Sequence, residues 1–182
     1  AGYELTPLKP HEVARRGVAR TFQNIELFRN MKVLDNLLVG QHTHIRSGLL
    51  ADAFSLSRMR REELRSRERV QQIMKFLGLQ DVQDHLASSL PFGHQKLLEL
   101  GRALAADPKI LLLDEPASGM NNQETTVLRH LIEEIRTRLG ITILLVEHDM
   151  GVVMKVCDRV SVLNFGVKIA EGTPQEIQNN PE

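Results

Sequence analysis

Two apolar runs in the second half of the chain predict buried β-strands. Residues 109–115 read KILLLDE and residues 141–149 read ITILLVEHD, so each run has four consecutive apolar side chains before its charged residues begin. An apolar run without alternation is typical of a central parallel strand that is covered on both faces. Shorter β-leaning runs lie at 17–22 and 159–165, and a turn through Gly166 leads from the latter to a last run, VKIAEG.

Apolar residues at helical spacing predict amphipathic helices between the strands. Residues 57–77 carry an i, i+3, i+4, i+7 stripe and end at Gly78. A second helix follows Asn121 or Asn122, either of which can cap it, and ends at Gly140. The stripes consist of Val70, Ile73, Met74 and Leu77 in the first helix and of Val127, Leu128, Leu131, Ile132, Ile135 and Leu139 in the second.

Weaker signals complete the helix pattern. Residues 30–42 have apolar side chains at helical spacing, with Asp35 as a candidate start, and a helix over 94–105 is halted by Asp107-Pro108. A short helix follows the second apolar run, and TPQE at 173–176 is a capping box with proline in the first helical position. Strands and helices alternate with short connections, which predicts an α/β fold with a right-handed, mostly parallel sheet.

Composition narrows the class of protein. The 182 residues, of which 42% are hydrophobic, suffice for one domain with a substantial core. Lys plus Arg and Asp plus Glu number 23 each, so the chain has no overall electrostatic bias toward nucleic acid. The single cysteine, Cys157, excludes an internal disulfide framework and fits a reducing compartment. No apolar run approaches the roughly 18 residues of a membrane span.

The helix over 57–77 interleaves basic and acidic side chains at pairing distance, which favours a solvated or partner-facing helix over a nucleic-acid surface. The preceding segment, SGLLADAF at 47–54, has apolar side chains that fit either docking to a partner or ordinary packing. The arginines of the helix are Arg58, Arg60, Arg61, Arg65, Arg67 and Arg69, its glutamates Glu62, Glu63 and Glu68, and the apolar residues of the segment Leu49, Leu50 and Phe54.

Acidic side chains follow both buried strands. Asp114 and Glu115 end the first strand, and residues 147–149, EHD, end the second. In open α/β sheets, ligands bind beyond the carboxyl ends of the strands. An aspartate there can hold Mg²⁺ and the next carboxylate can orient an attacking water for phosphoryl transfer. The alternative is a buried strand that ends in an exposed acid without function, and LLLDE alone does not separate the two.

Four motifs in fixed order favour a phosphoryl-transfer site over an exposed acid without function. RTFQN at 20–24, LPFGHQKLLELGRALAADP at 90–108, ILLLDEPASGMN at 110–121 and ILLVEHDM at 143–150 resemble the ATP-binding subunits of ABC transporters over the whole length of the chain. Within that family, RTFQNIELFRNMKVLDNLLVGQH and the terminal EGTPQEIQNNPE look closest to the ATPase of bacterial branched-chain amino-acid uptake systems. The resemblance implies a P-loop NTPase-like fold and Mg²⁺-dependent hydrolysis of ATP.

The resemblance also implies roles for single residues. Gln23 matches the Q-loop glutamine, which senses Mg²⁺ and the attacking water, and Asp114 matches the Walker B aspartate that holds Mg²⁺. Glu115 matches the catalytic carboxylate and His148 the switch histidine at the γ-phosphate.

Two segments match loops that reach ATP across a subunit interface. Residues 90–95 occupy the signature loop, where a helix N-terminus offers backbone N–H groups to the γ-phosphate of ATP held by the partner subunit. Residues 118–121 match the D-loop. The implied contact residues are Leu90, Pro91, Phe92, Gly93, His94 and Gln95 in the first loop and Ser118, Gly119 and Asn121 in the second. ATP would thus lie between two subunits.

The sequence departs from the family pattern in two places. The usual signature, Leu-Ser-Gly-Gly-Gln, is replaced by residues 90–94, LPFGH, which keep Gly93 but lose the hydroxyl donor. No G-x-x-x-x-G-K-[ST] occurs in the chain, so the backbone cradle and the lysine of the P-loop are missing. By resemblance the chain begins after the P-loop strand and helix, and we expect it to lack autonomous turnover.

The resemblance implies three segments and several partners. Residues 1–30 would be a remnant of the RecA-like core with the Q-loop, 31–93 a helical subdomain that ends in the signature loop, and 94–182 the rest of the core with a C-terminal hairpin and helix. The partners would be a second ATPase subunit and transmembrane permease subunits, without nucleic acid, at the cytoplasmic face of a bacterial membrane.

Two functions other than transport-coupled ATP hydrolysis are possible for this sequence. The chain could be a non-catalytic module that only binds a membrane subunit, which nucleotide binding would distinguish. An ABC-type ATPase of DNA repair would need long coiled-coil insertions, and the absence of heptads argues against it.

Overall fold

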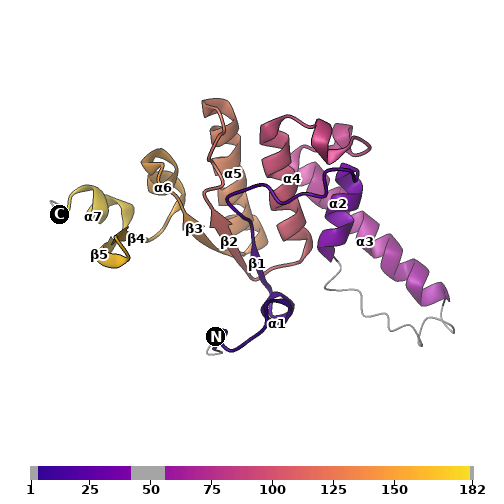
Figure 1. Cartoon of the computed structure of the whole chain (residues 1–182), viewed down its shortest axis with the longest axis horizontal. Helices are drawn as coiled ribbons and strands as arrows, with labels where there is room; N and C mark the ends of the chain where they lie inside the picture. Colours follow the sequence, from indigo (N-terminus) through magenta and orange to yellow (C-terminus); the bar gives the residue numbers. More distant parts are fainter. Residues whose placement is uncertain (1–3, 42–55, 181–182) are drawn as a thin grey trace.

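The computed structural model of the chain describes residues 4–41 and 56–180. Leu49, Leu50 and Phe54 lie outside the described residues. Three strands form a parallel sheet in the order β1 (Val18–Arg20), β2 (Ile110–Asp114) and β3 (Thr142–Val146). Because the strands are parallel, their carboxyl ends meet at one edge of the sheet, which is uppermost in Figure 1.

Helices cover one face of this sheet. Leu111 and Leu113 of β2 are buried in one apolar core with residues of α4 (Phe92–Ala105) and α5 (Asn122–Leu139). The core residues of these helices include Leu98, Leu100, Leu104, Leu128, Leu131, Ile132 and Ile135. A central parallel strand and two covering helices therefore arise where the sequence predicts them.

The other face of the sheet is open in the described structure. Leu144 and Val146 of β3 are 60% and 55% exposed, and alternate residues of β2 are more exposed than Leu111 and Leu113. The prediction that both strands are covered on both faces is therefore wrong for the described residues. An unbroken apolar run gives no information on which face is covered, so periodicity alone could not reveal the difference.

The two covering helices differ in how well the sequence located them. The side chain of Asn121 caps α5, a capping box with Glu124 reinforces the start, and Gly140 ends the helix with φ of 66°. Helix α4 begins at Phe92 after Pro91, not at the predicted His94. Proline fits this position because its missing N–H has no intrahelical partner there. Two residues assigned to the apolar stripe of α5 are about half exposed, which corrects the prediction for Val127 and Leu139.

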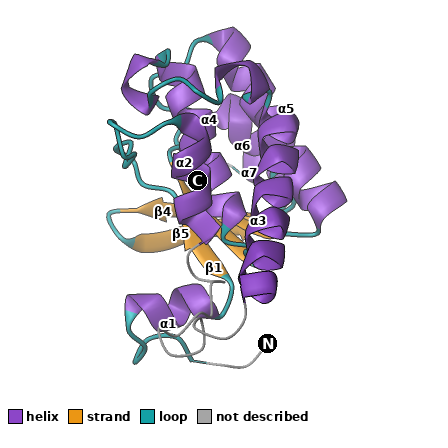
Figure 2. Cartoon of the chain, turned by 90° about the vertical axis from the view of Figure 1, so that its right-hand side faces the viewer, coloured by secondary structure: helices purple, strands orange, loops and turns teal. Residues whose placement is uncertain are grey.

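A helical part lies on one side of the sheet in Figure 1 and faces the viewer in Figure 2. It contains α2 (Val33–Gly40), α3 (Leu56–Leu77) and the short 3₁₀ turns η3 (Gln80–Val82) and η4 (Ala87–Ser89). The predicted stripe of α3 packs into the core, and Gly78 ends the helix with φ of 69°. Lys32 precedes the first residue of α2, so Asp35 lies inside the first turn and does not start the helix.

Helix α2 and helix α4 approach each other closely. A Cβ on Gly40 would lie 2.4 Å from the backbone oxygen of Arg102 and 3.0 Å from the Cβ of Ala105. Only glycine fits such a backbone approach. The helical part is therefore packed directly against the helix that also covers the sheet.

The C-terminal part does not join the parallel sheet. After α6 (Met150–Val156), β4 (Val160–Asn164) and β5 (Val167–Gly172) pair antiparallel in a separate two-stranded sheet. The prediction of strands at these positions is confirmed, but they do not extend the parallel sheet. The capping box at Thr173 starts α7 (Pro174–Gln178), and α1 (Pro10–Arg15), which no pattern predicted, precedes β1. Among the described helices, none is both long enough and apolar enough to span a membrane.

Candidate active site

The residue after β2 has an unusual backbone conformation. Glu115 has φ of 44°, in the left-handed region that a non-glycine residue rarely occupies. Its N–H donates to the backbone oxygen of Val146 at 2.9 Å, which continues the pairing of β2 with β3 by one residue. Such a conformation costs about 1–3 kcal/mol and is found preferentially at functional sites. It turns the Glu115 side chain out of the alternation of the strand.

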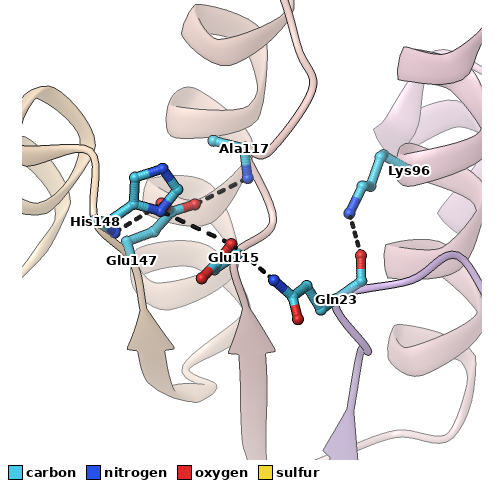
Figure 3. A network of polar contacts seen from close by, with 6 residues as sticks. All are labelled: Gln23, Lys96, Glu115, Ala117, Glu147 and His148. Atoms are coloured by element: carbon cyan, nitrogen blue, oxygen red, sulfur yellow. Dashed lines mark hydrogen bonds and ion pairs between the residues drawn. The ribbon is translucent and has the colours of Figure 1, made fainter.

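The carboxylate of Glu115, which follows β2, is contacted by residues that follow the other two parallel strands. The Nε2 of Gln23 donates to its Oε2 at 3.2 Å, and the Nδ1 of His148 lies 3.8 Å from the same oxygen (Figure 3). Gln23 follows β1, Glu115 follows β2 and His148 follows β3. Three residues that are far apart in the sequence and matched separate motifs are thus brought together.

Asp114, the last residue of β2, is held by an ion pair on the open face of the sheet. The Nη2 of Arg20 lies 2.8 Å from its Oδ2, and both side chains are partly exposed. Arg20 pairs in register with Leu112, two residues before Asp114, so both side chains project from the same face. No sequence motif suggested this pairing.

The donor atoms at this edge suit Mg²⁺, which prefers oxygen ligands such as the carboxylate of Asp114 and the amide oxygen of Gln23. In residues 4–41 and 56–180, no group of three His, Cys, Asp or Glu side chains could hold a metal ion by itself. Mg²⁺ usually keeps several waters and is bound by one or two protein ligands together with phosphate oxygens. The residues therefore fit a magnesium ion that arrives with a phosphate ligand.

Glu147 fixes the shape of this edge, a role that sequence reasoning did not assign. Its side chain is 1% exposed and accepts hydrogen bonds from the backbone N–H of Ala117 at 2.9 Å and of His148 at 3.2 Å (Figure 3). It thereby ties the loop after β2 to the end of β3. Its place between an apolar strand and His148 was the signal available in the sequence.

The two loops matched to the subunit interface lie against each other. A Cβ on Gly119 would be 2.9 Å from Cε1 of Phe92, and one on Gly93 would be 2.3 Å from Oε1 of Glu124. Gly119 also has φ of 79°, a conformation that favours glycine. Residues 90–95 and 118–121 therefore form one packed surface.

The residues of that surface differ in exposure. Leu90 and Gly93 are buried, and the Nε2 of Gln95 donates to the backbone oxygen of Leu90 at 2.9 Å. Phe92 is 46% exposed at the first turn of α4. The remaining residues are exposed or half-buried: Pro91, His94, Ser118, Gly119 and Asn121. None of these side chains has a described polar contact with the Glu115 carboxylate, but the backbone N–H of Ser118 donates to the backbone oxygen of Glu115 at 3.1 Å.

Two charged side chains of α4 contact the loop that carries Gln23. The Oε1 of Glu99 accepts from the backbone N–H of Phe22 at 3.4 Å and of Glu26 at 3.3 Å. The Nζ of Lys96 donates to the backbone oxygen of Gln23 at 3.2 Å. Burial raises the pKa of the Glu99 carboxyl, while the two backbone N–H groups, Lys96 and Arg102 act in the opposite direction.

The buried carboxyl of Glu99 should make stability fall as pH rises. A raised pKa in the folded state means that folding favours the neutral form, so this stability is complete below the ordinary glutamate pKa of 4.5 and is lost above it. We expect Glu99→Gln to unfold at a higher urea concentration than the parent at about pH 7, with the difference shrinking toward about pH 4. Equal pH dependence of the two proteins would contradict this assignment.

Comparison with protein families supports the assignment of the motifs to ABC transporters. The ABC transporter family matches residues 2–118, and the branched-chain amino acid ATP-binding cassette transporter family matches residues 167–182. The high-affinity branched-chain amino acid transport ATP-binding protein BraF of Pseudomonas aeruginosa is 41% identical over 181 residues, covering 100% of this chain and 71% of the relative. The corresponding Escherichia coli protein LivG is 43% identical over 178 residues, covering 98% and 70%.

Solved structures show the same fold. An ATP-binding cassette of an ABC transporter, MJ1267 in its ADP conformation, superposes with a TM-score of 0.77 at 34% identity, covering 94% of this chain and 67% of that chain. A nucleotide-free ATP-binding cassette gives a TM-score of 0.73 at 29% identity, with coverages of 96% and 69%. The chain therefore belongs to the ATP-binding subunits of ABC transporters and has their α/β fold.

Proposed function

We propose that this chain is the ATP-hydrolysing part of an ABC importer for branched-chain amino acids. The observation that carries the proposal is the Glu115 carboxylate, which Gln23 and His148 approach from two other strand ends. The family supports an ATP-binding subunit, and the relatives named for branched-chain amino acids support the solute class.

Each residue at the edge has a chemical task in this proposal. Asp114 and the amide oxygen of Gln23 would hold Mg²⁺. The carboxylate of Glu115 would orient the attacking water and accept its proton as the bond between the γ-phosphorus and the ADP oxygen breaks and ADP leaves. His148 donates a hydrogen bond toward the γ-phosphate. When bound, Mg-ATP would supply the phosphoryl group, and its Mg²⁺ ion would neutralise the negative charge of the phosphate oxygens. Glu147 keeps the loop after β2 in place.

The packed surface of residues 90–95 and 118–121 is proposed to face a second ATPase subunit. The first turn of α4, at which Phe92 is exposed, would present backbone N–H groups and the positive end of the helix dipole to ATP held by that subunit. Residues 31–93 would be the helical subdomain, between core segments 1–30 and 94–182. Permease subunits would bind the assembly at the cytoplasmic face of the membrane.

Phosphate binding in this proposal also needs the motif G-x-x-x-x-G-K-[ST], which the 182 residues do not contain. We therefore define a joined chain, in which an N-terminal segment of an ABC ATPase carrying that motif precedes this sequence. The joined chain is expected to bind Mg-ATP and hydrolyse it, and the 182-residue chain is expected to show no saturable binding. Saturable binding by the 182-residue chain would contradict the requirement for the motif.

The role of Asp114 is tested by titrating the joined chain with ATP in the presence and absence of Mg²⁺. Asp114→Asn removes a carboxylate ligand, so we expect it to weaken binding of Mg-ATP at least about tenfold and to leave metal-free ATP binding nearly unchanged. Asp81→Asn, at an exposed position without a described partner, is the matched control. An unchanged magnesium dependence in Asp114→Asn would contradict the proposed metal role.

A further inference from the structure

Two charged side chains of α4 are buried where the helix packs on the loop that carries Gln23. Lys96 is 6% exposed and Glu99 is 3% exposed, and they lie one turn apart on the same helix. Burying charged groups is costly unless they are hydrogen-bonded, and apolar residues would pack at lower cost. The contacts that these side chains make should therefore explain their presence.

Glu99 holds the loop on both sides of Gln23. Its Oε1 accepts from the backbone N–H of Phe22, one residue before Gln23, and from that of Glu26, three residues after it. The described structure provides no other acceptor for these two N–H groups. One carboxylate oxygen of α4 therefore holds the loop at two points, one before and one after Gln23.

Lys96 contacts both Gln23 and the first turn of α4. Its ammonium donates to the backbone oxygen of Gln23 at 3.2 Å and lies 5.9 Å from the centre of the Phe92 ring (Figure 3 shows the former contact). A cation over an aromatic face is an attractive contact. The backbone of Gln23 is thus linked through one side chain to the residue that begins α4.

Phe92 extends the linkage to the loop at 118–121. Its ring edge leaves too little room for a Cβ on Gly119, so a shift of the Phe92 ring would move the packing of that loop. Gln23 in turn donates its side-chain amide to Glu115. One continuous series of contacts therefore runs from the surface of residues 90–95 and 118–121 to the Glu115 carboxylate.

We propose that Lys96 and Glu99 are positioning residues that clamp the Gln23 loop to α4. Through this clamp, a change at Phe92, the exposed residue of the first turn of α4, such as contact with a second subunit, moves the Gln23 amide relative to Glu115. The clamp itself is independent of nucleotide, and only its consequence for catalysis rests on the proposed function. Neither residue touches the reacting groups.

Amide hydrogen exchange and NMR of the 182-residue chain without nucleotide test the clamp. In Glu99→Ala, exchange of the Phe22 and Glu26 amides should rise at least about tenfold, while amides of β2 and β3 keep their parental rates. In Lys96→Met, the side-chain amide resonance of Gln23 should shift because the loop is released from one side. Glu99→Gln and Lys96→Arg retain an acceptor and a cation and should restore the parental behaviour.

Glu133→Ala, an exposed glutamate of α5 without a described side-chain contact, is the matched control and should change neither readout. Parental exchange at Phe22 and Glu26 together with a parental Gln23 resonance would overturn the clamp. So would a rise in exchange that is equal in β2 and β3, since that reports general loosening. If Glu99→Ala does not fold, the Gln23 side-chain amide resonance in Lys96→Met and Lys96→Arg tests the clamp. If these exchange and NMR results support the clamp but the joined chain does not hydrolyse ATP, the proposed function alone would be contradicted.

Discussion

Glu115→Gln is expected to make the joined chain accumulate as an ATP-bound dimer. Glutamine keeps the size of the side chain and can still contact Gln23, but it cannot accept a proton from the attacking water. Binding of Mg-ATP should remain, because Asp114 and the phosphate-binding motif are unchanged. With hydrolysis slowed, two subunits that close around ATP do not separate, and light scattering with Mg-ATP should report a dimer that persists.

The matched control for this variant is Glu133→Gln, which makes the same chemical change at an exposed position on α5. It should pair only transiently, as the parent does. A Glu115→Gln protein that stays monomeric with bound Mg-ATP would contradict either the water-orienting role of Glu115 or the pairing of subunits around ATP, and the control together with the binding titration separates the two.

Asn36→Leu is expected to lower the free energy of unfolding by about 2–4 kcal/mol. Asn36 is fully buried, its Oδ1 accepts from the backbone N–H of Phe28 at 3.0 Å, and its Nδ2 donates to the backbone oxygen of the same residue at 3.1 Å. Further bonds reach the backbone oxygens of Met31 and Lys32. Leucine has a similar size but leaves the Phe28 N–H without an acceptor and removes one of the donors to each of the three backbone oxygens, which keep a backbone N–H partner.

Urea unfolding measures this loss, with Asn30→Leu as the control at an exposed position. The control should change stability by less than about 0.5 kcal/mol. A loss of similar size in both variants, or none in Asn36→Leu, would contradict the role of Asn36 in holding the segment that leads from the Gln23 loop into α2.

Local signals predicted much of the fold. The run 110–114 is β2, Asn121 and Gly140 bound α5, and Gly78 ends α3, because caps and apolar runs act within a few residues. The exposed face of β3 and the separate pairing of β4 with β5 depend on which elements lie nearby, which no local pattern contains.

The site shows the same division. Asp114, Glu115, Gln23 and His148 lie in recognisable motifs, and the last three meet in space, although their roles remain proposals. Arg20, Lys96 and Glu99 were not predicted as part of the site, and Glu147 was placed at the strand end without a role. Each acts through a partner 30 or more residues away or through a backbone atom of another element. From sequence alone, charged residues in an amphipathic helix are predicted to be exposed to solvent, and only the structure shows that Lys96 and Glu99 are buried.

In the proposed function, the Glu115 carboxylate is the general base for hydrolysis of ATP at the edge of the parallel sheet. The most direct measurement is the rate of phosphate release from Mg-ATP by the joined chain, its Glu115→Gln variant and its Glu133→Gln variant at one protein concentration. The proposed chemistry predicts a rate at least about a hundredfold lower in Glu115→Gln alone, in line with the contribution of a general base. Release at the parental rate by Glu115→Gln would contradict it.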